Sequence, residues 1–272
     1  MTETTHASRI LITSGTGKTG RRLAARLPGA RVASRSSATP FDWTDPATWA
    51  PALTGAEAVY LAYHPDITAP EAAAVLGAFA RRAADLGTRR IVLLSGRGMT
   101  RAAEAEEAVR GAGVPECTVL RASWFSQNFS EEFLVEAVRA GEVALPSAPG
   151  VAEPFLDAED IADAARAALA GEVAPGTYEL TGPRPLTFEE AAAELSAATG
   201  REIRFRAVSP AAYAASLPLP PEVAALLTGL FTEVLDGRNA GTAPDLAGLL
   251  PAPPREFAAY ARATAATGVW AG

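Results

Sequence analysis

The sequence predicts an α/β protein in which a parallel sheet carries helices on both faces and is joined to a smaller, mostly helical C-terminal lobe. In the first half of the chain, short apolar runs alternate with longer stretches of helical period, a pattern typical of βαβ units. After about residue 140 the segments become shorter and prolines separate them. The chain has 272 residues, enough for a sizeable core. We therefore expect a main domain over residues 1–150 and a lobe over residues 151–272 that shares one or two strands with the main sheet.

The main domain is predicted to alternate strands with helices. The strands are expected at residues 9–13, 31–34, 58–62, 90–95 and 117–121. The helices are expected at residues 18–27, 46–53, 70–86, 101–111 and 127–140. Only residues 35–40 separate the second strand from Phe41, so a loop is expected there in place of the usual crossover helix. The next helix is expected to begin after Asp45 and Pro46, which suit an N-cap and a first helical position.

The lobe is predicted to mix short strands with helices. It begins with a strand and a turn over residues 141–150, followed by a loop and an amphipathic helix that ends at Gly171. A further strand precedes a helix that is expected to begin at Thr187, because Glu190 stands at the spacing of a capping box. Prolines break residues 210–267 into short helices. This pattern favours a lid or a substrate-binding lobe over an independent domain.

The composition argues against several functional classes. Apolar residues make up 49% of the chain and charged residues 20%, as in ordinary soluble globular proteins. The formal net charge is −7 and no basic cluster is present, which argues against binding to nucleic acid or to anionic membranes. The single cysteine, Cys117, cannot form an internal disulfide, and the N-terminal sequence MTETTHASR does not resemble a signal peptide. We expect a cytoplasmic protein with a small-molecule partner and no metal site.

Gly15, Gly17 and Gly20 form a Gly-x-Gly-x-x-Gly run in the sequence ILITSGTGKTGRRLAARL, between the first predicted strand and the first predicted helix. The alternative interpretation is an ordinary tight turn. In this context, however, the glycines permit close approach of the backbone to a pyrophosphate, which then faces the helix N-terminus. The sequence therefore predicts a Rossmann-type, nucleotide-binding main domain. The other residues of this turn that are expected to contact the nucleotide are Thr16, Lys18 and Thr19.

The residue that follows the second strand indicates which nucleotide is bound. NAD-binding proteins place an acidic residue about 20 positions after the glycine run, where it binds the ribose hydroxyls. This chain has Arg35 there, flanked by Ser34 and Ser36, and no carboxylate until Asp42. A guanidinium and two hydroxyls suit a 2′-phosphate. The sequence therefore predicts NADP(H) as the cofactor, the alternative being a solvated surface arginine.

Further candidate residues follow the other strands, because ligands of open α/β sheets bind beyond the carboxyl ends of the strands. Asp42 and Trp43 are expected near the adenine. Tyr63, His64 and Ser95 are expected to flank the ribose and the nicotinamide. The residues expected to cover the nicotinamide or to line the substrate pocket are Trp124, Phe125 and Asn128. For the aromatic residues the alternative is a place in the core.

The tyrosine and lysine of ordinary ketone reduction are missing. A short-chain dehydrogenase normally uses a tyrosine as proton donor and a lysine four residues on, completed by a serine from the fifth strand. Ser95 stands in the place of that serine, but no tyrosine is followed by a lysine at this spacing, and Lys18 is the only lysine. Arg97 and Arg101 lie near the missing pair, but a guanidinium is always charged and is a poor proton donor. Ordinary ketone reduction is therefore not expected.

Several motifs together resemble a known family. They are SGTGKTG, VASRSS, FDWTDPATW, VYLAYHP, RASWFSQNF and FLDAEDIADAA. The combination resembles the NmrA-like group of atypical short-chain dehydrogenase/reductases, and within it the ergot-alkaloid reductases of the festuclavine dehydrogenase kind. The resemblance covers about residues 10–187 and is weaker in the lobe. It implies a Rossmann fold, NADP(H), and a substrate cleft between the sheet and the lobe. Relatives often have proline where this chain has Ala122, and a proline run where it has Tyr63, His64 and Pro65.

The resemblance implies a reductase of electron-poor, planar substrates such as iminium ions, quinones and cationic dyes. Such acceptors take hydride without prior protonation, so the missing tyrosine and lysine do not contradict catalysis. A product proton, where required, is expected from His64, Tyr63 or water; the alternative for His64 is a structural role at a strand end. Two other functions stay open: an NADP-sensing regulator without catalysis, and a non-redox cyclase or isomerase on the same fold. The sequence does not indicate the oligomeric state.

Overall fold

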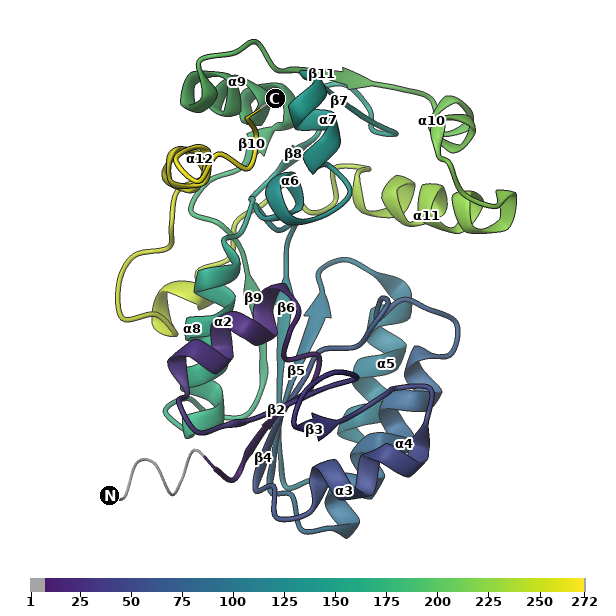
Figure 1. The fold of residues 1–272 in the computed structure, drawn as a ribbon, viewed down its shortest axis with the longest axis vertical. Helices are drawn as coiled ribbons and strands as arrows, with labels where there is room; N and C mark the ends of the chain where they lie inside the picture. Colours follow the sequence, from purple (N-terminus) through teal and green to yellow (C-terminus); the bar gives the residue numbers. More distant parts are fainter. Residues whose placement is uncertain (1–7, 272) are drawn as a thin grey trace. The chain divides into compact units, whose positions relative to one another are not determined.

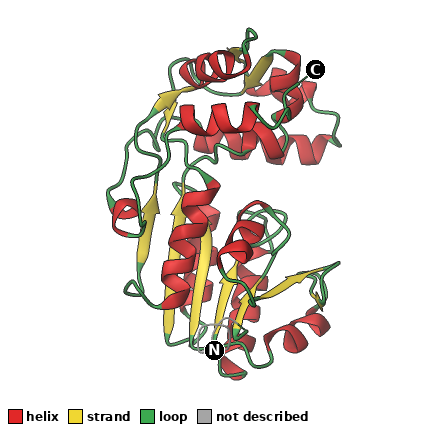
Figure 2. Cartoon of the chain, turned by 60° about the vertical axis from the view of Figure 1, so that its left-hand side comes forward, coloured by secondary structure: helices red, strands yellow, loops and turns green. Residues whose placement is uncertain are grey.

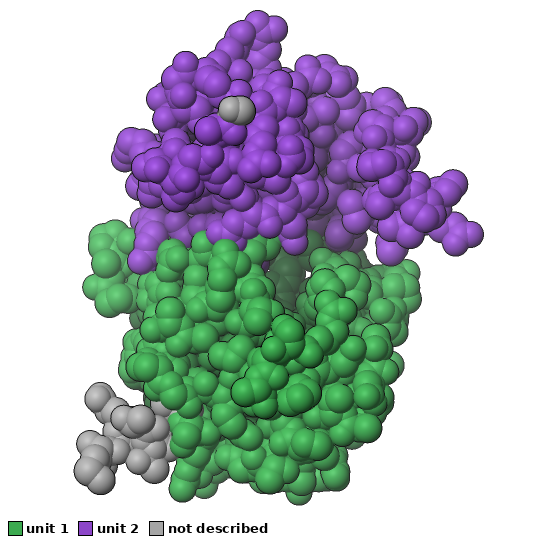
Figure 3. All heavy atoms as spheres, viewed as in Figure 1, with its two compact units in different colours: residues 1–122, 158–180, 244–253 green, residues 123–157, 181–243, 254–272 purple. Residues whose placement is uncertain are grey.

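The computed structural model describes residues 8–271 and divides the chain into two compact units, each discontinuous in sequence (Figure 3). The first unit comprises the residues up to 122 together with 158–180 and 244–253. The second comprises residues 123–157, 181–243 and 254–272. This division differs from the single boundary expected near residue 150. The reason is that the chain returns to the first unit after residue 157, adding a helix and a strand to the main sheet.

The first unit is built on a seven-stranded parallel sheet, which confirms the predicted fold class. Its strand order is β3-β2-β1-β4-β5-β6-β9. The strands are β1 (Ile10–Ile12), β2 (Arg31–Ser34), β3 (Thr39–Pro40), β4 (Ala58–Leu61), β5 (Arg90–Gly96), β6 (Glu116–Ala122) and β9 (Thr177–Leu180). The five strands predicted in the main domain are all present. The last strand, β9, follows the predicted amphipathic helix and pairs with β6.

Helices cover both faces of this sheet (Figure 1). On one face lie α3 (Trp49–Leu53), α4 (Ala72–Asp85) and α5 (Thr100–Arg110); on the other lie α2 (Lys18–Arg26) and α8 (Ala158–Ala170). Two short 3₁₀ turns, η1 (Pro46–Thr48) and η2 (Asp245–Gly248), complete the unit. Side chains on the α4/α5 face form the core; among them are Leu11, Val59, Leu93, Leu76 and Phe79.

Two predictions for the first half of the chain were wrong in detail. The loop expected over residues 35–40 contains the short strand β3, whose Thr39 pairs with Ala33 of β2. The single helix expected over residues 127–140 is two helices, α6 (Asn128–Glu131) and α7 (Val135–Ala140). The break is at Glu132, whose extended backbone (φ −150°, ψ −151°) cannot continue a helix.

The second unit contains two small sheets and six helices among its described residues (Figure 2). β8 (Ala152–Glu153) pairs antiparallel with β10 (Leu186–Thr187), and β7 (Glu142–Leu145) pairs parallel with β11 (Arg204–Ala207). Besides α6 and α7, the helices are α9 (Phe188–Thr199), α10 (Pro210–Ser216), α11 (Pro221–Val234) and α12 (Phe257–Ala265). The capping box of α9 is confirmed: Thr187 accepts from Glu190 N–H at 3.1 Å, and Glu190 accepts from Thr187 N–H at 2.8 Å.

Three further points concern a membrane-spanning helix, a metal site and the N-terminal sequence. Among the described residues, no helix combines the length and hydropathy needed to cross a membrane. Residues 8–271 also contain no group of three or more His, Cys, Asp or Glu side chains suited to holding a metal ion. The prediction made from the N-terminal sequence rests mostly on residues 1–7, which lie outside the described part of the chain.

Candidate nucleotide-binding site

The glycine run forms a tight turn between β1 and α2. Ser14 begins the turn with a positive φ of 48°, and Gly17 N–H donates to the Ser14 carbonyl at 2.9 Å. A Cβ at Gly15 would lie 2.6 Å from Val32 Cγ1, and a Cβ at Gly20 would lie 2.4 Å from the Ser14 carbonyl oxygen. Neither position has room for a side chain, because β2 and the start of α2 approach the turn so closely. The glycines therefore have the packing role that a nucleotide-binding turn requires.

The N-terminus of α2 is suited to an anion. Gly17 is its N-cap, no side chain caps the helix, and its first turn contains no acidic residue. The first N–H groups of a helix have no intrahelical acceptor and attract negative charge. Lys18, the first residue of the helix, adds a positive charge at this end. The arrangement can hold a phosphate or a pyrophosphate.

Hydrogen bonds to Tyr60 of β4 and to Ala62, just after this strand, hold the turn in place. Thr13 Oγ1 donates to the Tyr60 carbonyl at 2.9 Å, and Ser14 Oγ donates to the Ala62 carbonyl at 2.7 Å. The Tyr60 hydroxyl donates to Thr19 Oγ1 at 3.0 Å, and both side chains are buried. Thr19 was expected to contact the nucleotide; its Oγ1 accepts from Tyr60, which leaves its own hydroxyl proton and its backbone N–H as possible donors. Tyr60 was not identified from the sequence, although a hydroxyl in an otherwise apolar strand was a visible signal.

Arg35 lies in a loop that is organised by its neighbours. Ser34 N–H donates to Ser37 Oγ at 2.9 Å, Ser37 Oγ donates to the Thr39 carbonyl at 2.8 Å, and Ser36 N–H donates to Ser34 Oγ at 3.3 Å. Arg35 itself is exposed and makes no hydrogen bond or ion pair to any described residue. Its guanidinium is available to a ligand. Ser37 is a loop-forming residue that the sequence analysis missed.

Asp42 and Trp43 have different environments. Asp42 Oδ1 accepts from Thr44 N–H at 2.9 Å and from Thr44 Oγ1 at 2.8 Å. These bonds hold the pKa of Asp42 below its usual value, and the charges of Arg35 and His64 act in the same direction. Trp43 is buried and packs against rings of the core, its centroid lying 4.8 Å from that of Phe41. Its burial argues against the expected contact with an adenine.

Tyr63 and His64 lie on the loop that follows β4. Tyr63 is partly buried against Trp43, with ring centroids 5.2 Å apart. Burial, together with the charge of Glu71, raises the pKa of Tyr63, so its phenol is neutral near pH 7. His64 is exposed. Both residues are accessible proton carriers on one loop.

Ser95 does not have the expected catalytic environment. Its side chain is buried, and its hydroxyl donates to Glu106 Oε1 at 2.6 Å. Glu106 is 1% exposed and also binds Arg121, whose Nη2 lies 2.6 Å from Glu106 Oε2. Burial disfavours the charge of Glu106, but hydrogen bonds from Arg121 and Ser95 outweigh it and lower the pKa of the carboxyl overall. The Ser95 hydroxyl donates its proton to the buried Glu106, which argues against the catalytic role expected for Ser95.

The predicted substrate residues all lie in the second unit. Trp124 is partly buried, and its ring centroid lies 5.5 Å from that of Phe188 and 5.5 Å from that of Phe231. Phe125 and Asn128 are also partly buried; Phe125 pairs with Leu156 in an isolated bridge. Of these three residues, Trp124 belongs to an aromatic cluster of the second unit. Its rings are Trp124, Phe133, Phe155, Phe188, Phe205, Tyr213 and Phe231.

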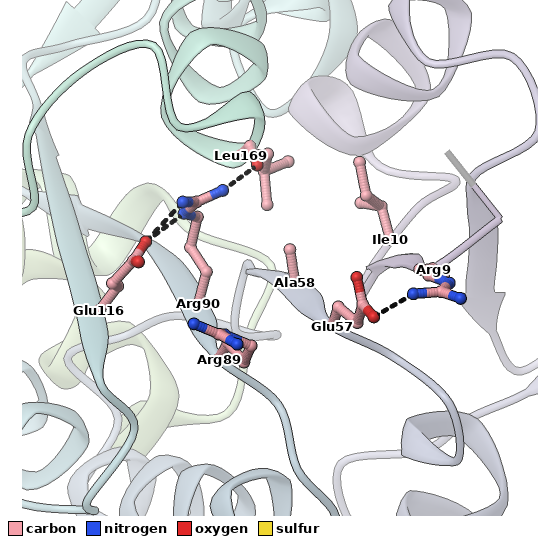
Figure 4. Close-up of a pocket in the computed structure, with 8 residues that line it drawn as sticks. All are labelled: Arg9, Ile10, Glu57, Ala58, Arg89, Arg90, Glu116 and Leu169. Carbon is pink, nitrogen blue, oxygen red and sulfur yellow. Dashed lines mark hydrogen bonds and ion pairs between the residues drawn. The ribbon is translucent and has the colours of Figure 1, made fainter. Parts of the chain in front are cut away.

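A cavity of about 250 Å³ lies at the opposite, amino-terminal edge of the sheet (Figure 4). Four of its charged side chains form ion pairs, Arg9 with Glu57 and Arg90 with Glu116, while Arg89 is exposed. Arg90 Nη1 also donates to the Leu169 carbonyl at 2.8 Å, near the C-terminus of α8. These contacts join the starts of neighbouring strands to each other and to the C-terminal end of α8. The cavity is a structural feature and supplies no candidate for catalysis.

Comparisons with known proteins show which family the chain belongs to. No protein-family model matches the chain. Agroclavine dehydrogenase of Claviceps fusiformis is 30% identical over 279 residues, covering 92% of this chain and 95% of that protein. The chain belongs to the NmrA-like family of atypical short-chain dehydrogenase/reductases. A reductase of Streptomyces griseus, named for (4-alkanoyl-5-oxo-2,5-dihydrofuran-3-yl)methyl phosphate, is also 30% identical, over 91% of this chain and 95% of its own. These NmrA-like relatives are oxidoreductases, and the chain is assigned to the same enzyme class.

Solved structures share the fold. Triphenylmethane reductase of Citrobacter sp. superposes with a TM-score of 0.77 at 19% identity, over 94% of this chain and 99% of that one. NmrA, a negative transcriptional regulator solved with NAD, superposes with a TM-score of 0.69 at 18% identity, over 93% of this chain and 94% of that one. At these identities the superpositions establish the NmrA-like fold. Proteins with this fold include both an enzyme and a regulator.

Proposed function

We propose that this chain is an NADPH-dependent reductase that transfers hydride to an electron-poor, planar acceptor, such as an iminium ion, a quinone or a related conjugated system. The observation that carries the cofactor proposal is Arg35. It follows β2, where an NAD-binding protein has a carboxylate, and its guanidinium is exposed and makes no hydrogen bond or ion pair to a described residue. Ser34 and Ser36 lie beside it. A guanidinium binds a phosphate in a bidentate, charge-assisted manner.

The pyrophosphate is assigned to the turn at Gly15–Gly20. Two observations support this assignment: the N-terminus of α2 has no side-chain cap, and a Cβ at Gly15 or Gly20 would clash with neighbouring atoms. Lys18 contributes a positive charge, and Thr16 and Thr19 contribute their backbone N–H groups. Asp42 stays a candidate for the adenosine side of the site. NADPH supplies the hydride when it is bound; the chain holds and orients it.

The acceptor class follows from the residues that are missing and from the relatives. The chain has no tyrosine–lysine pair, and Ser95 is committed to Glu106. An acceptor that takes hydride without prior protonation avoids the need for these groups. The relatives include agroclavine dehydrogenase and the (4-alkanoyl-5-oxo-2,5-dihydrofuran-3-yl)methyl phosphate reductase. We assign acceptor binding to Trp124, Phe125 and Asn128, and any product proton to His64 or Tyr63.

The test is oxidation of NADPH against a panel of quinones, iminium ions and triarylmethane cations, followed by absorbance. We expect turnover of at least one acceptor class, with NADPH preferred to NADH. Arg35→Ala should lower kcat/KM for NADPH by about tenfold or more, as expected for loss of a charge-assisted phosphate contact. Arg89→Ala is the matched control, because Arg89 is an exposed arginine at the amino-terminal edge of the same sheet. Loss of activity in both variants alike would contradict the assignment of Arg35.

A second candidate function is an NADP-binding regulator without catalysis. The observation that favours it is the exposure of large apolar side chains in the second unit: Phe133 (42%), Leu219 (41%), Val223 (43%) and Leu226 (54%). Exposed apolar surface is typical of a protein-binding site. Tight NADPH binding with no oxidation by any acceptor would favour this second function over the first.

A further inference from the structure

Tyr60 places a hydroxyl inside an apolar strand. β4 has the sequence AVYL, and all four residues are buried. A buried hydroxyl without a partner would destabilise the fold. The Tyr60 hydroxyl donates to Thr19 Oγ1 at 3.0 Å, and Thr19 is the second residue of α2. The hydroxyl thus links the middle of the sheet to the first turn of the helix.

Tyr60 of β4 and Ala62, just after this strand, also bind Thr13 and Ser14 at the start of the glycine turn. Thr13 Oγ1 donates to the Tyr60 carbonyl at 2.9 Å and accepts from Ala62 N–H at 3.1 Å. Ser14 Oγ donates to the Ala62 carbonyl at 2.7 Å. The residues between these anchors are Gly15, Thr16, Gly17 and Lys18. Gly15 N–H donates to the Ala33 carbonyl at 3.2 Å and Gly17 N–H to the Ser14 carbonyl at 2.9 Å, which hold the turn from within. Two of the four residues are glycines, which restrict the backbone least, so the anchors at the two ends also contribute to its conformation.

We infer that Tyr60 is a positioning residue for the cofactor: through Thr19 it fixes the first turn of α2, so that the N–H groups of this turn point at the pyrophosphate. This inference rests on the proposed function. Hydrogen bonds weaken steeply as the donor angle departs from linearity, so a small rotation of this turn is enough to weaken several of them. The Arg35 loop follows a different strand, β2, and is organised by its own serines. Loss of the Tyr60 hydroxyl should therefore affect the pyrophosphate and leave the 2′-phosphate contact unchanged.

The experiment compares two ligands that share only part of the site. NADPH carries both phosphate groups, whereas adenosine 2′-monophosphate carries the 2′-phosphate and no pyrophosphate. Tyr60→Phe should weaken NADPH binding about fivefold, the change expected for one hydrogen bond of ordinary strength, with adenosine 2′-monophosphate unaffected. Thr19→Val should produce the same loss, and the double variant no further loss. Thr19→Ser keeps the hydroxyl and should recover most of the NADPH affinity that Thr19→Val loses.

Tyr260→Phe is the matched control. The Tyr260 hydroxyl is also buried and donates to Ser130 Oγ at 2.7 Å, but both residues lie in the second unit. This variant should lower the Tm without changing the Kd for NADPH.

Three results would overturn the inference. The first is a lowered Tm in Tyr60→Phe and Thr19→Val with NADPH affinity within about twofold of the unmodified protein, since Tyr60 would then be only structural. The second is equal weakening of both ligands. The third is absence of NADPH binding by the unmodified protein, which would refute the proposed function as well. If Tyr60→Phe does not fold, Thr19→Val and Thr19→Ser decide the question.

Discussion

Arg35 and Ser95 lie at the carboxyl ends of strands of one sheet, yet their side chains serve different purposes. Arg35 is exposed and makes no bond to a described residue, whereas the Ser95 hydroxyl is buried against Glu106. Local sequence suggests a functional role for each of them. The difference depends on Glu106, a residue 11 positions further along the chain that faces back from α5. Sequence spacing cannot show such a partner, so the contact of Ser95 with Glu106 could not be predicted.

Ser95→Ala tests this reassignment. Removal of the hydroxyl takes one hydrogen bond from the buried Glu106 carboxylate, so we expect a loss of about 1–2 kcal/mol in the free energy of unfolding. The kcat for the acceptor should change by less than about twofold, since Ser95 touches neither ligand in this account. Denaturant unfolding and steady-state kinetics measure the two quantities. A large fall in kcat at unchanged stability would restore Ser95 as a catalytic residue.

Glu106 should also control stability in acid. Its folded pKa lies below the usual value of 4.5, mainly because of bonds from Arg121 and Ser95 that outweigh the effect of burial. A group with a lowered folded pKa stabilises the protein above its unfolded pKa, and this contribution is lost as the pH falls through the folded value. Glu106→Gln should therefore cost about 2 kcal/mol at pH 7 and make the free energy of unfolding less dependent on pH below about 4.5. Parallel pH profiles of the two proteins would contradict this.

At the scale of elements, local signals were sufficient wherever a helix end or a strand was defined by its own residues. The capping box of α9 and the N-cap of η1 at Asp45 were predicted correctly, because each depends on residues within three positions. The short strands β3 and β11 were missed, because they exist only through pairing with β2 and β7. The break between α6 and α7 was also missed; Phe133, just after it, packs against Trp124 with centroids 6.3 Å apart, a contact that no helix periodicity predicts.

The capping box gives a prediction at this scale. Thr187→Ala removes the acceptor for Glu190 N–H and should lower the free energy of unfolding by about 1 kcal/mol. Thr187→Ser retains the acceptor and is the control. Thermal unfolding of the two variants and the unmodified protein provides the comparison. An equal Tm for Thr187→Ala and Thr187→Ser would show that the capping bond contributes no stability.

At the scale of the whole molecule, the two units have different chemistry. The first unit holds the glycine turn and Arg35, and the second holds the aromatic cluster at Trp124. The sequence analysis named the glycine turn, Arg35 and Trp124 but not the other rings of the cluster. It expected the lobe to share a strand with the sheet, but it placed the boundary near residue 150. In the structure, residues 123–157 belong to the second unit, whereas α8, which follows them, packs on the sheet of the first unit. Such a return of the chain depends on long-range strand pairing, here between β6 and β9.

This separation predicts how variants of the aromatic cluster will behave. Trp124→Ala should raise KM for a planar acceptor about tenfold or more, because a large aromatic contact is lost. The Kd for NADPH should not change, since the cofactor residues belong to the other unit. Tyr178→Phe, which removes only an exposed bond to the Ala174 carbonyl, is the control. A rise in the Kd for NADPH in Trp124→Ala would contradict the division of tasks.

The measurement that tests the central claim most directly is a paired titration of the protein with NADPH and NADH at one ionic strength, repeated with Arg35→Ala and Arg89→Ala. The account predicts that NADPH binds at least about tenfold more tightly than NADH, that Arg35→Ala removes this preference, and that Arg89→Ala retains it. Equal affinity of the unmodified protein for the two nucleotides, or a preference that survives Arg35→Ala, would contradict it.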